Sequence, residues 1–194
     1  MAKLYFYYSA MNAGKTTTLL QSEYNYRERG MNTLLFTPVF DDRYEKNHIV
    51  SRIGLKASAI PFDKNFDFYH FVEQKLKEPN HRIKCVLVDE AHFLSKEHVE
   101  QLSNISDFLG LPVLTYGLRT DFLGEPFEGS KYLLAHAEEL CEIKTICHCG
   151  RKATMNARID SNGVMVTKGA QVEIGGNDRY VSLCHRHFKK KVTA

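Results

Sequence analysis

Residues 4–16 read Leu4-Tyr5-Phe6-Tyr7-Tyr8-Ser9-Ala10-Met11-Asn12-Ala13-Gly14-Lys15-Thr16. The run before Ser9 is apolar and aromatic, which is typical of a buried strand. A helical pattern follows from about Thr17 to Arg29 and stops at Gly30. A strand, a loop ending in Gly-Lys-Thr and a helix are the setting of the phosphate-binding motif G-x-x-x-x-G-K-[ST]. The sequence therefore predicts a phosphate site, although Ser9 replaces the first glycine of the motif.

The residues of this loop have defined tasks in phosphate binding. Backbone N–H groups and the positive end of the helix hold phosphate oxygens. The Lys15 side chain would reach the outer phosphates, and the Thr16 hydroxyl would ligate Mg²⁺. The alternative is a helix that begins with Gly-Lys-Thr by chance. That alternative does not account for the acidic strand end found later in the chain.

This second polar motif follows an apolar strand. The strand predicted at Ile83–Val88 reads IKCVLV and is followed by Asp89 and Glu90. An Asp at such a strand end is the usual second support for Mg²⁺. A Glu immediately after it is placed to take a proton from a nucleophile. Because the nucleophile can be water or a substrate hydroxyl, these residues predict Mg·ATP chemistry without separating an ATPase from a kinase.

Strand and helix patterns alternate over most of the chain. Further elements are predicted as strands at Thr33–Thr37 and Pro112–Leu118, and as helices at Phe68–Lys77 and from Ser95 to about Leu109. Residues 40–65 carry many charges and little periodicity, so they are predicted to be largely loop. The alternation predicts an α/β fold of the P-loop NTPase type, with a mainly parallel sheet flanked by helices.

Length and composition limit the remaining possibilities. The 194 residues allow an ATP-binding domain at 1–140 and a smaller β-rich domain at 141–194, where short strand-like pieces replace long helices. No apolar run approaches about 18–20 residues and no signal peptide is recognisable, so the protein is expected to have no membrane partner and to be cytoplasmic. The net charge of +3 is too small to indicate nucleic acid, and the basic cluster Lys189–Lys191 is interpreted as a solvated tail.

The cysteines predict a metal site. Five cysteines are an odd number, which does not suit a disulfide framework, and three of them stand close to histidines. Cys147-x-Cys149 and Cys184-x-x-His187 supply four ligands for tetrahedral Zn²⁺, and a site with four protein ligands is structural rather than catalytic. The interleaved His148 is expected to point away from the metal, and ordinary free thiols remain the alternative.

Taken together, these motifs and several others resemble one family. The segments that carry the resemblance are Ser9 to Thr16, Asp41-Asp42-Arg43-Tyr44, Val88-Asp89-Glu90, Tyr116-Gly117-Leu118-Arg119-Thr120-Asp121-Phe122, Cys147-x-Cys149 and Ile174-Gly175-Gly176-Asn177-Asp178-Arg179-Tyr180. In this order they resemble the bacterial thymidine kinases of the zinc-containing, human-cytosolic type (type II). The resemblance extends over nearly the whole chain, from Leu4 to Phe188.

The resemblance implies roles on the nucleotide side of the site. Glu90 would be the base that accepts the proton of the nucleoside 5′-hydroxyl. ATP and Mg²⁺ would be held by the loop residues, by Asp89, and by Arg43 together with Asp41. The loop residues concerned are Ser9, Ala10, Met11, Asn12, Ala13, Gly14, Lys15 and Thr16.

The resemblance also implies a nucleoside pocket. Met11, Leu118 and Phe122 would line the thymine site. A lasso loop anchored by the zinc module would grip the base through main-chain hydrogen bonds, and its residues would be Gln171, Val172, Glu173, Ile174, Gly175 and Tyr180. Because a pocket for one methyl group discriminates only about 10–200-fold, deoxyuridine should be accepted as well.

The implied activity is transfer of the γ-phosphoryl group of Mg·ATP to thymidine, giving dTMP and ADP in pyrimidine deoxynucleoside salvage. The resemblance further implies a homotetramer and feedback inhibition by thymidine triphosphate (dTTP). The competing hypothesis is a P-loop ATPase whose zinc module binds nucleic acid. It predicts salt-sensitive DNA binding, which the small net charge disfavours.

Overall fold

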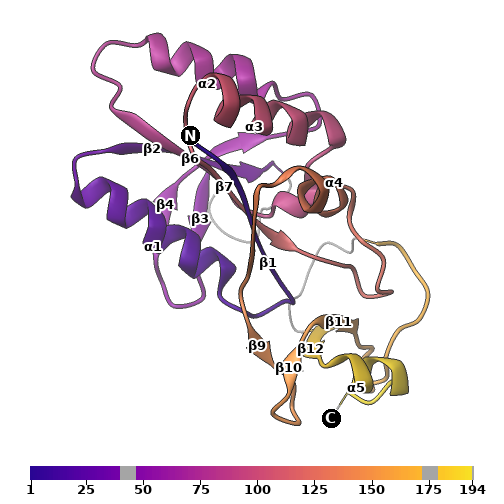
Figure 1. Ribbon diagram of the computed structural model, residues 1–194. Coiled ribbons are helices and arrows are strands. Elements are labelled where there is room, and N and C mark those ends of the chain that lie inside the picture. The colour runs from indigo at the N-terminus through magenta and orange to yellow at the C-terminus, as the bar shows by residue number, and fades with distance from the viewer. Residues whose placement is uncertain (40–46, 172–178, 194) are drawn as a thin grey trace.

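The computed structural model describes residues 1–39, 47–171 and 179–193 (Figure 1). Its centre is a six-stranded sheet in the order β5-β2-β6-β7-β1-β8, in which every neighbouring pair is parallel. The strands are β1 (Leu4–Ser9), β2 (Asn32–Pro38), β5 (Ile60–Phe62), β6 (Ile83–Val88), β7 (Val113–Leu118) and β8 (Glu139–Glu142). This arrangement confirms the predicted parallel α/β sheet.

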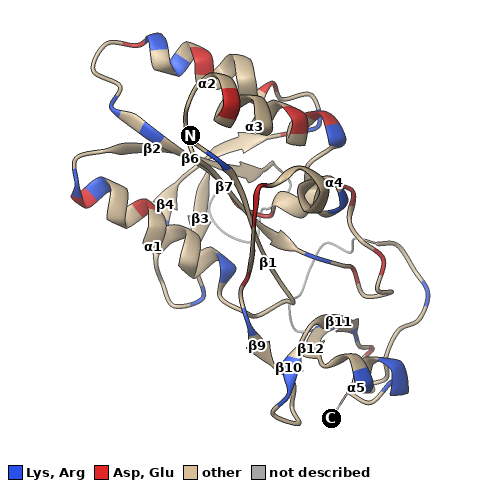
Figure 2. Ribbon diagram, in the orientation of Figure 1, with Lys and Arg blue, Asp and Glu red and all other residues tan. Residues whose placement is uncertain are grey.

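Helices cover both faces of the sheet. One face packs against α2 (Phe68–Lys77), α3 (Lys96–Phe108) and α4 (Glu128–His136), and the other against α1 (Lys15–Glu28) and the hairpin of β3 (His48–Val50) and β4 (Lys56–Ser58). Side chains alternate along β6: Val86 and Val88 enter the first core, whereas Cys85 and Leu87 enter the second. Since both faces are covered, the strand is apolar and buried from Cys85 to Val88, and only Lys84 near its start is exposed. Figure 2 shows many charged residues on α2 and α3 and few on the central strands β1 and β7.

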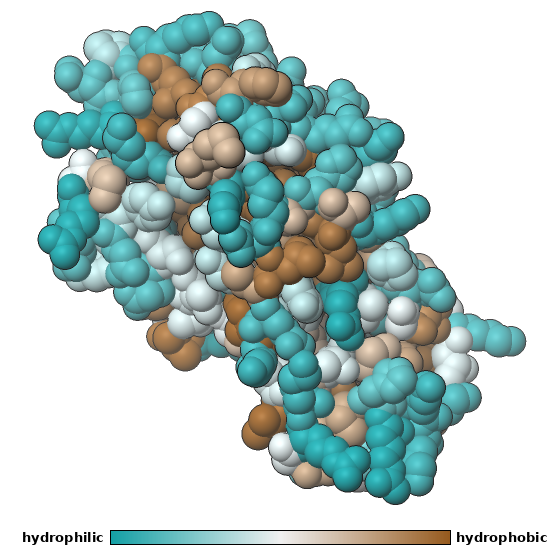
Figure 3. All heavy atoms as spheres, viewed as in Figure 1, coloured by the Kyte–Doolittle hydropathy of each residue, from teal (hydrophilic) through white to brown (hydrophobic). Residues whose placement is uncertain are grey.

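A smaller module follows β8. It contains β9 (Thr145–Ile146), β10 (Lys152–Ala153), β11 (Met155–Arg158), β12 (Tyr180–Leu183) and α5 (His185–Lys190). β9 pairs with β10 and β11 with β12, both antiparallel. A core of its own contains Cys147, Ala153, Ala157, Leu183 and Cys184. On the face drawn in Figure 3 this module forms the narrower lower part of the molecule, and its visible surface is mostly hydrophilic.

The element predictions were mostly right and failed in two regions. The strands at β1, β2, β6 and β7 and the helices α1, α2 and α3 lie within a few residues of their expected bounds. The stretch 40–65 was predicted as largely loop. This prediction was wrong for β3, β4 and β5, which are only three residues long each. The helix α4 was not predicted, and neither was η1 (Ala91–Phe93), a single 3₁₀ turn that follows Glu90.

Two expectations about the surface can also be compared with the structure. Within the described ranges, no helix has both the length and the apolar character needed to cross a bilayer. The basic residues Lys189 and Lys190 are exposed at the end of α5, in agreement with a solvated position. The proposed division of the chain near residue 141 stays a prediction, and β8, at Glu139–Glu142, still pairs with the main sheet.

Candidate active site

The loop between β1 and α1 is folded as a phosphate-binding loop would be. Asn12 (φ 60°) and Gly14 (φ 81°) adopt left-handed conformations, and Gly14 caps the N-terminus of α1. The Lys15 ammonium is buried and donates to Ser9 Oγ at 3.0 Å and to the Ala10 carbonyl at 3.2 Å. Ser9 therefore supplies a partner for Lys15 at the position where the general motif has glycine.

The acidic end of β6 lies next to this loop. The Thr16 hydroxyl donates to Asp89 Oδ2 at 3.2 Å, and Asp89 Oδ1 accepts from the Glu90 N–H at 3.0 Å. Asp89 is only 4% exposed; its burial, together with the negative charge of Glu90, raises the pKa of this carboxyl to about 7. A carboxylate and a hydroxyl are hard oxygen ligands of the kind that Mg²⁺ prefers. The pair fits a magnesium ion, which would also favour the ionised form of Asp89.

Glu90 is presented by a strained backbone turn. Its φ of 47° is in the left-handed region, and it caps the 3₁₀ turn η1. Neighbouring His92 is buried between Phe93 and Phe127, and its Nδ1 accepts from the Leu118 N–H at 3.2 Å. This Nδ1 lies 3.5 Å from Glu90 Oε2. His92 thus accepts a structural hydrogen bond that connects the turn after Glu90 to the end of β7.

A cavity of about 290 Å³ opens between these elements. Its lining includes the loop from Met11 to Thr16, the acidic pair Asp89 and Glu90, and Leu118. Of the ten residues that the sequence predicted in the phosphate loop and the acidic pair, eight line the cavity, and Ser9 and Ala10 do not. Two predicted nucleoside-side residues, Met11 and Leu118, also line it. The hairpin also contributes lining residues that sequence reasoning missed, namely His48, Ile49, Val50, Arg52 and Ile53. Among these five residues, only Arg52 is of a type that commonly binds phosphate, and it stands in no recognisable motif.

The other predicted nucleoside-side residues lie outside the lining of this cavity. Phe122 is 1% exposed, and the guanidinium of Arg158 stands 3.9 Å above its ring. Gln171 Nε2 donates to Asp121 Oδ2 at 3.0 Å, and Tyr180 pairs with Arg158 across the β11–β12 ladder. Asp41, Arg43, Val172, Glu173, Ile174 and Gly175 are outside the described residues.

Arg158 is a residue that the sequence did not single out. It is 6% exposed, and it donates from Nη1 to the Ala170 carbonyl at 3.2 Å and from Nη2 to the Lys168 carbonyl at 3.3 Å. The chain passes close over the guanidinium at Gly169, where a Cβ atom would stand 2.3 Å from Nη2. Arg158 therefore fixes residues 168–170 against Phe122, directly before Gln171.

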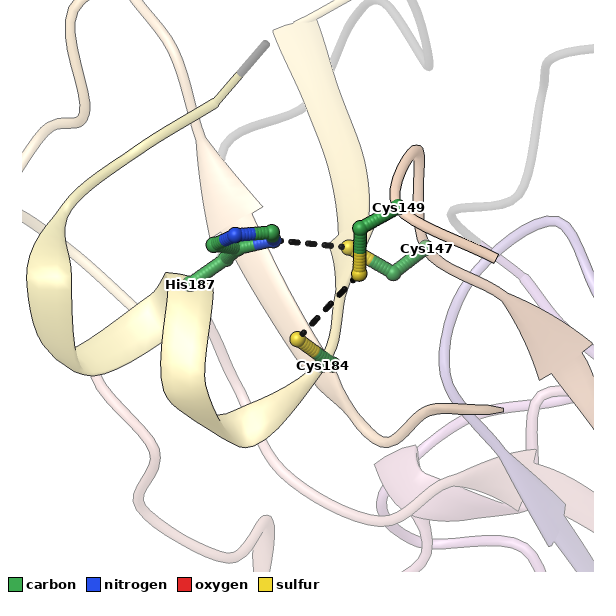
Figure 4. Close-up of side chains that lie close together, drawn as sticks. All are labelled: Cys147, Cys149, Cys184 and His187. Atoms are coloured by element: carbon green, nitrogen blue, oxygen red, sulfur yellow. Dashed lines mark hydrogen bonds between the residues drawn. The ribbon is translucent and has the colours of Figure 1, made fainter. Parts of the chain in front are cut away.

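The four predicted metal ligands come together in the small module (Figure 4). Ligand atoms of Cys147, Cys149, Cys184 and His187 all lie within 4.8 Å of one another. The Cys149 and Cys184 sulfurs are 3.9 Å apart, close to the roughly 3.8 Å between thiolates on one tetrahedral Zn²⁺. Burial raises the pKa of the Cys147 thiol, but hydrogen bonds to the Cys149 and Cys184 backbone and to His187 outweigh it and lower this pKa to about 6. The donor set therefore fits a zinc ion.

His148 does not behave as expected. It is not one of the four clustered residues, but its ring stacks on His187 with centroids 4.4 Å apart. Its Nδ1 is 3.7 Å from Cys147 Sγ. The prediction that His148 points away from the cluster was therefore wrong, because the ring of the ligand His187 offers it a stacking surface.

Comparison with known proteins identifies the family. The family model described as "Thymidine kinase" matches residues 2–188. The thymidine kinase of Coxiella burnetii (strain RSA 493 / Nine Mile phase I) is 61% identical over 189 residues, or 97% of this chain and 96% of that protein. Those of Agrobacterium fabrum (strain C58 / ATCC 33970) and Vibrio cholerae serotype O1 are 61% and 58% identical over 97% and 98% of this chain, and cover 96% and 98% of their own lengths.

Similarity to a solved structure is much weaker. A Bacteroides Pif1 bound to single-stranded DNA superposes with a TM-score of 0.38 at 12% identity, covering 73% of this chain and 38% of that one. By its family match and its near-full-length relatives, the chain belongs to the thymidine kinase family.

Proposed function

We propose that this chain transfers the γ-phosphoryl group of Mg·ATP to the 5′-hydroxyl of thymidine, giving dTMP and ADP in pyrimidine deoxynucleoside salvage. The observation that carries the proposal is the position of Glu90 in the cavity wall beside Asp89 and the phosphate loop, in a member of the thymidine kinase family. A carboxylate at this position can accept the proton of a hydroxyl that attacks a phosphate held by the loop.

On the nucleotide side, the loop N–H groups and the α1 N-terminus bind the phosphates. Lys15 leaves Ser9 and the Ala10 carbonyl to reach the outer phosphates, and Thr16 and Asp89 hold Mg²⁺. The magnesium ion, when bound, neutralises charge that develops on the phosphate oxygens. Asp41 and Arg43 are proposed to contact the phosphates on the strength of the resemblance alone.

On the acceptor side, Glu90 takes the proton of the 5′-hydroxyl while the hydroxyl oxygen forms a bond to the γ-phosphorus. The bond from that phosphorus to the bridging oxygen breaks, and its electron pair leaves with ADP. The Leu118 N–H donates to His92 Nδ1, and this bond connects the turn that follows Glu90 to one wall of the nucleoside pocket.

The nucleoside pocket is proposed to extend from Met11 and Leu118 toward Phe122, Tyr180 and the lasso residues. The lasso residues are Gln171, Val172, Glu173, Ile174 and Gly175. Support comes from the anchoring of residues 168–171, where Arg158 and Asp121 hold the chain beside Phe122. A loop tied down at its near end loses less conformational entropy when it closes on a ligand.

The Cys147, Cys149, Cys184 and His187 cluster is proposed to hold a structural Zn²⁺, because all four tetrahedral positions are supplied by protein. Cysteines in a metal site stay reduced in the cytoplasm, which supports the predicted location. A homotetramer and feedback inhibition by dTTP are proposed from the resemblance.

Incubation with Mg·ATP and labelled thymidine tests the proposed activity. We expect thymidine-dependent ADP release with labelled dTMP as product, and deoxyuridine should replace thymidine with at most about 10–200-fold loss of efficiency. ADP release that ignores thymidine and responds to DNA would instead indicate the ATPase alternative. No thymidine-dependent product at all would refute the proposal.

A further inference from the structure

The peptide of Met11, in the phosphate loop, is held by two side chains of the small module. Its N–H donates to Asn156 Oδ1 at 2.7 Å, and its carbonyl accepts from Ser182 Oγ at 2.5 Å. Asn156 is on β11 and Ser182 on β12, which lie next to the end of β1 in Figure 1. These contacts join residues 145 and 171 positions apart in the chain, so the loop is fixed from outside its own domain.

The two side chains form one rigid unit. Asn156 and Ser182 are direct partners in the antiparallel ladder, with Met155 opposite Leu183 on the next rung. Asn156 is 2% exposed, and its Nδ2 donates to the Thr120 carbonyl at 2.8 Å, so its amide orientation is defined by both contacts. We call Asn156 and Ser182 the Met11 clamp.

The clamp acts where the loop most needs support. Met11 is followed at once by Asn12, whose φ of 60° lies in the left-handed region that non-glycine residues adopt less often. An unsupported loop would spend time in other conformations, and its apparent affinity for phosphate would fall by the fraction of time lost. With both polar groups of Met11 engaged, the peptide cannot rotate without breaking two hydrogen bonds.

We propose that Asn156 and Ser182 are positioning residues for Mg·ATP. Through them the small module holds the phosphate loop in the conformation that binds the nucleotide, in addition to its proposed role in the nucleoside pocket. The inference rests on the proposed function, since it assumes that Mg·ATP binds in this loop. Neither side chain lines the cavity, so their effect on the nucleotide is transmitted through the Met11 peptide.

The test compares variants of the full chain by calorimetric titration with Mg·ATP and, separately, with thymidine. Ser182→Ala removes one clamp bond, and Asn156→Leu removes the other together with the Thr120 contact. Ser182→Thr keeps the hydroxyl. Thr193→Val is the matched control, because Thr193 Oγ1 donates to the Gly163 carbonyl in the same module, far from the loop in sequence.

We expect Ser182→Ala to raise the Kd for Mg·ATP about three- to tenfold, in line with loss of one hydrogen bond, and Asn156→Leu to raise it further. The KM for ATP should rise with it, while the Kd for thymidine stays within twofold of wild type in Ser182→Ala. Ser182→Thr should restore the affinity, and Thr193→Val should match wild type. Zinc content per chain confirms that the module is intact in each variant.

Two results would overturn the clamp. One is a Kd for Mg·ATP within twofold of wild type in Ser182→Ala, and the other is equal weakening of ATP and thymidine binding, which would mean that the effect of Ser182 is not specific to phosphate binding. Failure of the proposed function would look different, since wild-type protein itself would then yield no thymidine-dependent ADP.

Discussion

Replacement of Asp89 by Asn should stabilise the protein without nucleotide while disabling it as an enzyme. Asp89 is nearly completely buried, and burial with the adjacent Glu90 charge raises its pKa from 3.8 to about 7. An Asn keeps the shape of the side chain. Its oxygen can still accept from the Glu90 N–H, and its amide can donate to the Thr16 hydroxyl, which now stands 3.2 Å from Oδ2.

The size of the effect follows from linkage between ionisation and folding. Well below pH 3.8 the carboxyl is protonated in both the unfolded and the folded chain, so it does not lower the free energy of unfolding. Between pH 3.8 and about 7 the unfolded chain ionises first and the free energy of unfolding falls; above about pH 7 the loss is complete. At about 1.4 kcal/mol per pH unit, the cost is roughly 2 kcal/mol at about pH 5.5 and roughly 4 kcal/mol at about pH 8.5.

Urea unfolding of wild type and Asp89→Asn at these two pH values measures the difference. The variant should gain about 2 kcal/mol more over wild type at the higher pH than at the lower. Asp107→Asn, at an exposed position on α3, is the control for loss of one negative charge. If the gain of Asp89→Asn is the same at both pH values, or no larger than that of the control, Asp89 does not carry a buried ionisation cost and the reasoning is wrong.

Three further predictions concern the base, the metal cluster and the anchored loop. Glu90→Gln should lower kcat about 10²–10⁴-fold with thymidine binding retained, measured by steady-state kinetics and titration; unchanged turnover would exclude Glu90 as the base. Cys184→Ser should lower zinc content and weaken thymidine binding, and full zinc occupancy in this variant would contradict its role as a ligand. Gly169→Ala should raise the KM for thymidine, because its Cβ would displace the Arg158 guanidinium and φ is 138°, whereas Gly163→Ala (φ 77°), with nothing within 4 Å, should leave KM unchanged.

The parts of the fold that the sequence predicted are those whose signal is local. The strand β6 is apolar on both faces from Cys85 to Val88. The start of helix α3 is marked by Ser95, whose hydroxyl accepts from the His98 N–H as an N-cap. The missed strand β5 has the opposite character. It is three residues long and contains Pro61, which reads as a strand breaker but is tolerated here at the sheet edge.

The helix α4 was missed because tertiary contacts decide it. Its first turn contains Gly129 and Ser130, both poor helix formers. Gly129 is required there by packing, since a Cβ would stand 2.4 Å from the Ala91 carbonyl. The sequence shows the cost of this glycine to the helix and does not show the close contact with η1 that makes it necessary.

The same distinction separates the site residues that the sequence found from those it missed. Lys15, Asp89 and Glu90 were found because phosphate chemistry needs a cation and carboxylates, and only a few residue types supply them. Arg158 and Asn156 were missed because their partners are backbone carbonyls and N–H groups, which nearly every residue carries. A side chain that binds the backbone leaves no complementary residue elsewhere in the sequence to complete a motif. Residues that position a loop are therefore visible only once the fold has brought the two segments together, which is why the Met11 clamp had to be read from contacts between β11, β12 and a loop more than 140 residues away.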